Sequence, residues 1–78
     1  MTQHQLDLRG VSCPMNFVKT RLFLDKIAGG DLLIVLLDAG EPVESVSSSV
    51  QAEGHEIEHS EQAPAGHFAV SIRKSKSG

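Results

Sequence analysis

The sequence predicts an α/β fold, a two-layer sandwich in which a four-stranded mixed sheet carries two helices on one face. A chain of 78 residues allows one small domain with a single compact core. Stretches with the periodicity of strands and of helices follow one another in the order β-α-β-α-β-β. Glycines separate most of these stretches. We therefore expect one domain over residues 1–78, ordered from about residue 5 to residue 74.

The first strand is predicted over residues 5–9, because Leu6 and Leu8 alternate with the polar Asp7. Residues 10–12 turn the chain into a helix that we expect to run from Pro14 to about Ala28. Pro14 suits the first helical position, where a missing N–H costs nothing. Gly29 and Gly30 then end the helix. The predicted buried stripe of this helix consists of Phe17, Thr20, Leu24, Ile27 and Ala28.

The second strand is predicted over residues 32–37, a continuous apolar run typical of the interior of a sheet. Pro42, again suited to the first position, opens a second helix that ends near Gly54. Its buried stripe is Val43, Val46 and Val50.

The last two strands are predicted over residues 55–60 and 67–73, with the turn at residues 63–66. Both helices are expected on one face of the sheet. A right-handed crossover makes the first two strands parallel.

The composition excludes several classes of protein. A net charge of −3 argues against a nucleic-acid-binding protein, which usually shows a basic footprint. We see no apolar run of membrane-spanning length and no signal-peptide pattern, so we expect a cytoplasmic protein without a membrane partner. A single cysteine excludes an intramolecular disulfide and suits a reducing compartment.

That one cysteine, Cys13, stands between the first strand and the first helix. The first N–H groups of a helix lack partners within it, and the helix dipole adds partial positive charge there. Both effects stabilise a thiolate, whose free pKa is about 8.5. We expect the backbone N–H groups of residues 14–17, other than that of Pro14, to face the sulfur.

Other interpretations of Cys13 stay open on the residues alone. It could be a small buried hydrophobic residue, or a redox thiol whose resolving partner comes from another protein. A Cys–His hydrolase lacks a local signature that would place one of the four histidines beside it. We expect no metal site, because His55 and His59 would lie roughly 13 Å apart along a strand.

With this motif and element order, the chain resembles the TusA-like (SirA-like) family of small bacterial sulfur carriers. The segment that carries the resemblance is Leu6-Asp7-Leu8-Arg9-Gly10-Val11-Ser12-Cys13-Pro14-Met15, supported by Lys19-Thr20-Arg21, Gly30-Asp31, Glu53-Gly54-His55-Glu56-Ile57 and Ser71-Ile72-Arg73-Lys74. The resemblance implies that Cys13 accepts sulfane sulfur as a persulfide, with no cofactor. It also implies two partner proteins: a sulfur donor such as a cysteine desulfurase, and a downstream acceptor in tRNA thiolation or another sulfur route.

The chain departs from the family motif Cys-Pro-x-Pro at one position, where Asn16 replaces the second proline. We expect Pro14 and Asn16 to support the thiolate or persulfide, Asn16 through its restored N–H and its amide. Three cations are candidates for the same role, namely Arg9, Lys19 and Arg21. Arg9 has an alternative, which is to pair with Asp7 or with a nearby carbonyl.

Three apolar residues of the first helix lie on an arc beside its core stripe: Met15, Val18 and Leu22. Either they widen the buried face, or they form a docking patch for a partner close to Cys13, flanked by Lys19 and Lys26. A methionine suits an adaptable contact surface, and the basic rim would attract an acidic partner.

Two functions therefore follow from the sequence. The first is a sulfur carrier or sulfurtransferase that relays a persulfide on Cys13 between partner proteins. The second is a non-catalytic interaction or regulatory module of the same fold, in which Cys13 is a redox-sensitive or structural thiol.

Overall fold

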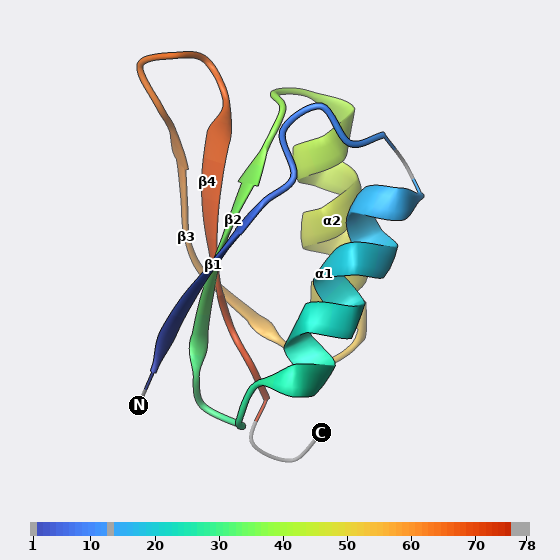
Figure 1. Ribbon diagram of the computed structural model, residues 1–78, viewed down its shortest axis with the longest axis vertical. Coiled ribbons are helices and arrows are strands. Elements are labelled where there is room, and N and C mark those ends of the chain that lie inside the picture. Colours follow the sequence, from blue (N-terminus) through green and yellow to red (C-terminus); the bar gives the residue numbers. More distant parts are fainter. Residues whose placement is uncertain (1, 13, 76–78) are drawn as a thin grey trace.

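The structure, a computed structural model, describes residues 2–12 and 14–75 (Figure 1). Four strands and two helices alternate in the predicted order. Their bounds are β1 Gln3–Asp7, α1 Met15–Lys26, β2 Leu32–Leu37, α2 Glu41–Ala52, β3 Glu56–Gln62 and β4 Phe68–Arg73.

The four strands form one mixed sheet in the order β1-β2-β4-β3. β1 pairs with β2 in parallel, whereas β4 pairs antiparallel with both β2 and β3. Figure 1 shows α1 and α2 side by side on one face of this sheet. The two-layer sandwich and the parallel pairing of the first two strands are confirmed.

The apolar strand β2 lies inside the sheet because both of its neighbours are strands. Its side chains alternate between the two faces, as any strand requires. Leu33, Val35 and Leu37 point toward the helices and are fully buried, whereas Leu32 and Ile34 belong to the alternate set that remains half-buried. A continuous apolar run therefore serves both the core and the uncovered face.

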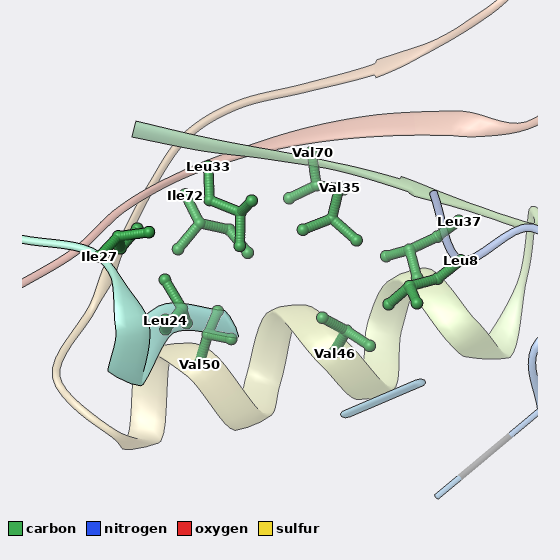
Figure 2. Packing of buried hydrophobic residues seen from close by; sticks show 10 residues of the cluster. All are labelled: Leu8, Leu24, Ile27, Leu33, Val35, Leu37, Val46, Val50, Val70 and Ile72. Carbon is green, nitrogen blue, oxygen red and sulfur yellow. The ribbon is translucent and has the colours of Figure 1, made fainter. Parts of the chain in front are cut away.

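The hydrophobic core fills the space between the sheet and the helices. Figure 2 shows Val35 and Val70 of the sheet above Val46 of α2, while Leu24 of α1 lies at the other end beside Val50. The complete buried cluster is Leu8, Leu24, Ile27, Leu33, Leu37, Val35, Val46, Val50, Val70 and Ile72. Leu8, the first residue after β1, and Leu37, the last of β2, lie together at the end of the core where these two strands end.

The bounds of the first helix differ from the prediction. α1 begins at Met15, so Pro14 is the residue before the helix rather than its first residue. α1 ends at Lys26, two residues early, and Ala28 is exposed.

The two edge strands also differ from the prediction. β1 spans Gln3–Asp7 and not residues 5–9, because its pairing with β2 already begins at Gln3 and the chain turns after Leu8. β3 begins at Glu56 and runs to Gln62, because its backbone pairs with β4 over this length and no apolar alternation marks its ends. The length of both edge strands is thus decided by the strand beside them.

No helix in the described part of the chain is both long enough and apolar enough to cross a membrane.

Candidate functional site

The segment before Cys13 is a tight turn at residues 8–11. Its N–H groups donate to the carbonyl of Leu8 and to the side chains of Asp7 and Asp38. Val11 N–H donates to the carbonyl of Leu8 at 3.1 Å and closes the turn. Gly10 has a φ of +81°, a conformation that other residues adopt only with strain. Its N–H donates to the carboxylate of Asp38 at 2.8 Å. The backbone is therefore fixed up to the second residue before Cys13.

Arg9 in this turn is paired with Asp7 instead of reaching the helix start. Its guanidinium donates to both carboxylate oxygens of Asp7, at 2.9 Å and 2.8 Å, and its backbone N–H donates to the same carboxylate at 3.0 Å. These donors, the Arg9 guanidinium first, lower the pKa of Asp7 to about 2. The structure thus shows the ion-pair alternative for Arg9.

At the start of α1, a side chain inside the helix accepts a backbone N–H. Pro14 makes no side-chain cap, and the oxygen of the Asn16 side chain accepts the N–H of Phe17 at 2.7 Å. Asn16 is fully buried and lies on the core stripe of α1 with Thr20 and Leu24. This stripe differs from the predicted one, because Asn16 takes an inward position and Phe17 is only half-buried.

The side-chain nitrogen of Asn16 is buried and has no hydrogen-bond partner among the described residues. A buried donor without a partner costs roughly 1–3 kcal/mol. Hydrophobic periodicity missed this position because a polar residue is not expected inside the core. Only the resemblance, which places a second proline at Asn16, drew attention to it.

Most N–H groups expected to face the sulfur already have acceptors. Asn16 N–H donates to the carbonyl of Ser12 at 3.1 Å, and Phe17 N–H to the Asn16 side chain. Between residues 8 and 18, the backbone N–H groups of Ser12 and Met15 make no hydrogen bond to a described residue. Among the N–H groups expected to face the sulfur, that of Met15 therefore has no acceptor among the described residues. The N–H of Ser12, on the other side of Cys13 in the sequence, also lacks a described acceptor.

The two cations of α1 that are predicted to support the sulfur, Lys19 and Arg21, differ in what surrounds them. Arg21 forms an ion pair at 3.2 Å with Glu53, which follows the end of α2. Lys19 is exposed and makes no ion pair with any residue in the described ranges. Of the three cations predicted to support the sulfur, Lys19 is therefore the one without an ion pair to a described residue.

An apolar patch lies on the outer side of α1, and we call it the α1 patch. It consists of Met15, Val18 and Leu22, whose exposed fractions are 48%, 38% and 55%. These are the exposed large hydrophobic residues of the described chain. Their spacing of three and four residues places them on one helical face. The structure thus puts them at the surface and not in a widened core.

Cys13 itself lies outside the described residues. Two open hollows, of about 300 Å³ and 220 Å³, include none of residues 9–18 in their linings. The first is lined by Gly30, Gly54, Glu56 and residues 73–75, and the second by Arg21, Asp25, Glu53, His55 and Lys74. Much of their charged lining is paired, as with Arg73 and Glu58 or Arg21 and Glu53. No cluster of three metal-ligating side chains occurs within the described ranges. The candidate-site residues that the structure describes lie in the turn after β1 and in α1.

Several known proteins are similar to this chain in sequence or in fold. A protein of Archaeoglobus fulgidus named "Putative sulfur carrier protein" is 36% identical over 69 residues, which is 88% of this chain and 78% of that protein. The crystal structure of a SirA-like protein from Desulfitobacterium hafniense has the same fold, with a TM-score of 0.82 and 18% identity over 92% of this chain and 97% of the other. The family model of sulfurtransferase TusA matches residues 4–74. The chain belongs to the TusA sulfurtransferase family.

Proposed function

We propose that this protein carries sulfane sulfur as a persulfide on Cys13 and relays it from a donor protein to an acceptor protein. The Cys13 thiolate attacks the terminal sulfur of the donor's persulfide. A new S–S bond forms on Cys13, the donor's own S–S bond breaks, and the donor leaves as a thiolate. An acceptor thiolate attacks the terminal sulfur on Cys13 in the same way. Each step exchanges one S–S bond for another and needs no cofactor.

The observation that supports this proposal most is the position of the free donors around residue 13. Ser12 and Met15 flank Cys13 in the sequence, and their N–H groups have no acceptor among the described residues. Met15 is also the first residue of α1, where the helix dipole favours an anion. An anionic thiolate or persulfide is therefore matched by unused donors, while Lys19 supplies a nearby positive charge.

We further propose that donor and acceptor dock in turn on the α1 patch. The patch begins two residues after Cys13, so a protein seated on it would have its reacting sulfur close to the loop. Lys19 and Lys26, both exposed, flank the three apolar side chains and make no ion pair with described residues. The expected partner surface is apolar at its centre and acidic at its rim.

Intact-mass spectrometry tests the proposal. The reduced protein is mixed with a cysteine desulfurase and cysteine, beside a Cys13→Ser control. A gain of one sulfur atom on the wild type alone, reversed by reductant, is the expected result. No gain with several desulfurases would favour the alternative, in which the domain is a non-catalytic interaction module.

A further inference from the structure

The carboxylate of Asp38 accepts a hydrogen bond from the turn at residues 8–11, which lies far from Asp38 in the sequence. Asp38 directly follows β2, and it accepts the N–H of Gly10 at 2.8 Å across 28 positions. Because β1 and β2 are parallel, their carboxyl ends meet at one edge of the sheet. The residues that follow the two strands are therefore neighbours there.

This bond completes the anchoring of the turn. The backbone ladder between β1 and β2 continues to the N–H of Leu8, which donates to Leu36 at 2.8 Å. Beyond it, the N–H of Arg9 is taken by Asp7 and that of Val11 by Leu8. The N–H of Gly10 lies beyond the backbone ladder, and it donates to the side chain of Asp38 at the end of β2.

Few hydrogen bonds between described residues hold the chain between Gly10 and α1. Ser12 N–H makes no hydrogen bond with a described residue, and the next described backbone bond is from Asn16 to the carbonyl of Ser12. Gly10 is also in the left-handed region, and a Cβ atom added there would meet no heavy atom within 4 Å beyond its chain neighbours. The two ends of the turn, Leu8 and Val11, pack in or against the core, whereas Gly10 between them is held by its hydrogen bond to Asp38.

We propose that Asp38 is a positioning residue for the sulfur-accepting cysteine, acting through the N–H of Gly10 to fix the loop against the end of β2. This inference rests on the proposed function and adds a residue to it. A small displacement of a reacting group can slow a reaction by up to about a hundredfold. Removal of the Asp38 acceptor is expected to reduce the reactivity of Cys13 without unfolding the domain, because Asp38 is exposed and outside the core.

The carboxylate has a second effect of opposite sign. A negative charge disfavours a thiolate close to it, so loss of the charge alone should not slow a reaction that needs the Cys13 thiolate. Two variants separate the effects, because Asp38→Asn keeps an acceptor oxygen without the charge and Asp38→Ala removes both. Asp25→Ala serves as a matched control, since Asp25 is an exposed carboxylate of α1 with no hydrogen bond to described residues.

The experiment measures three quantities in the full chain: the alkylation rate of Cys13 by iodoacetamide as a function of pH, the rate of sulfur uptake from a desulfurase, and hydrogen exchange of the Gly10 amide. We expect Asp38→Ala to speed Gly10 exchange and to slow both reactions about tenfold. Asp38→Asn should react at least half as fast as the wild type, and Asp25→Ala should match the wild type. Thermal unfolding of each variant verifies that it is folded.

The proposal is overturned if folded Asp38→Ala reacts within twofold of the wild type, or if Asp38→Asn is as slow as Asp38→Ala. Failure of the proposed function gives a different result. In that case the wild type takes up no sulfur, while the alkylation rates and the Gly10 exchange still report whether Asp38 positions the loop.

Discussion

The side chain of Asn16, in the first turn of α1, accepts the N–H of the next residue, Phe17, at 2.7 Å. The same amide group leaves its nitrogen buried without a partner among described residues. One half of the side chain thus stabilises the helix start, while the other half is destabilising. Two opposing contributions at one position make its replacement informative.

Asn16→Ala is expected to change the free energy of unfolding by less than about 1 kcal/mol. It loses one hydrogen bond to a backbone N–H, worth about 0.5–1.5 kcal/mol, and it removes an unpartnered donor that costs roughly 1–3 kcal/mol. Leu24→Ala, on the same buried stripe, should cost about 2–5 kcal/mol because it only opens a cavity. Urea denaturation of both variants measures the contrast. A loss above about 2 kcal/mol for Asn16→Ala would mean that the nitrogen has a stabilising partner in solution.

The α1 patch is expected to be needed for sulfur transfer and not for folding. Val18→Asp and Leu22→Asp place a carboxylate among exposed apolar side chains, so each should cut the rate of sulfur uptake at least about tenfold while shifting stability by no more than about 0.5 kcal/mol. Ala65→Asp, at the exposed turn between β3 and β4, is the control for added negative charge. Unfolding of both patch variants would instead assign these residues to the core.

Arg9 is expected to have little effect on the Cys13 thiol, because its guanidinium already donates to both oxygens of Asp7. Arg9→Gln should leave the alkylation rate of Cys13 at pH 7 within about twofold of the wild type. Lys19→Gln, which removes a cation with no described ion pair, should lower that rate more. If Arg9→Gln slows alkylation more than Lys19→Gln does, Arg9 acts on the thiolate directly.

Asp7 makes the protein sensitive to acid. Its pKa falls from the ordinary 3.8 to about 2 in the folded protein. A carboxyl group with a lowered folded pKa stabilises the fold above its unfolded pKa, and this contribution is lost as the pH falls from about 4 to about 2. His4 and the Thr2 N–H lower the pKa of Asp31 too, and therefore act in the same sense.

Urea midpoints measured between pH 5 and pH 2 test this assignment. Asp7→Asn should flatten the acid branch of the stability curve, because its side chain cannot be protonated in this range. An unchanged slope would show that the Asp7 ion pair does not contribute to the acid sensitivity.

Hydrophobic periodicity predicted the elements that are amphipathic or fully apolar. β2 was predicted with its observed bounds because six consecutive apolar residues stand between two aspartates. α2 was located by Pro42 and by its valine stripe. β3 was placed too early and too short, since an edge strand of polar residues shows no alternation and takes its length from pairing with β4.

The details of the site were less accessible from the sequence. Cys13 was singled out by its place between a strand and a helix, and helical spacing put Met15, Val18 and Leu22 on one arc, but their exposure was decided only by the structure. The bond from Gly10 to Asp38 is a long-range contact that no local pattern reports, although parallel strands would place the two strand ends together. Asn16 lies four residues before Thr20 on the buried stripe, but hydrophobic periodicity passes over a polar residue at such a position.

The most direct test of the central claim is to locate the transferred sulfur on the chain. After incubation with a desulfurase and cysteine, the protein is alkylated, digested and sequenced by tandem mass spectrometry. We predict one additional sulfur atom on the peptide that contains Cys13, located on that side chain and removed by reductant. A Cys13 peptide without added sulfur, under conditions in which the desulfurase itself is persulfidated, would contradict the assignment of this protein as a persulfide carrier.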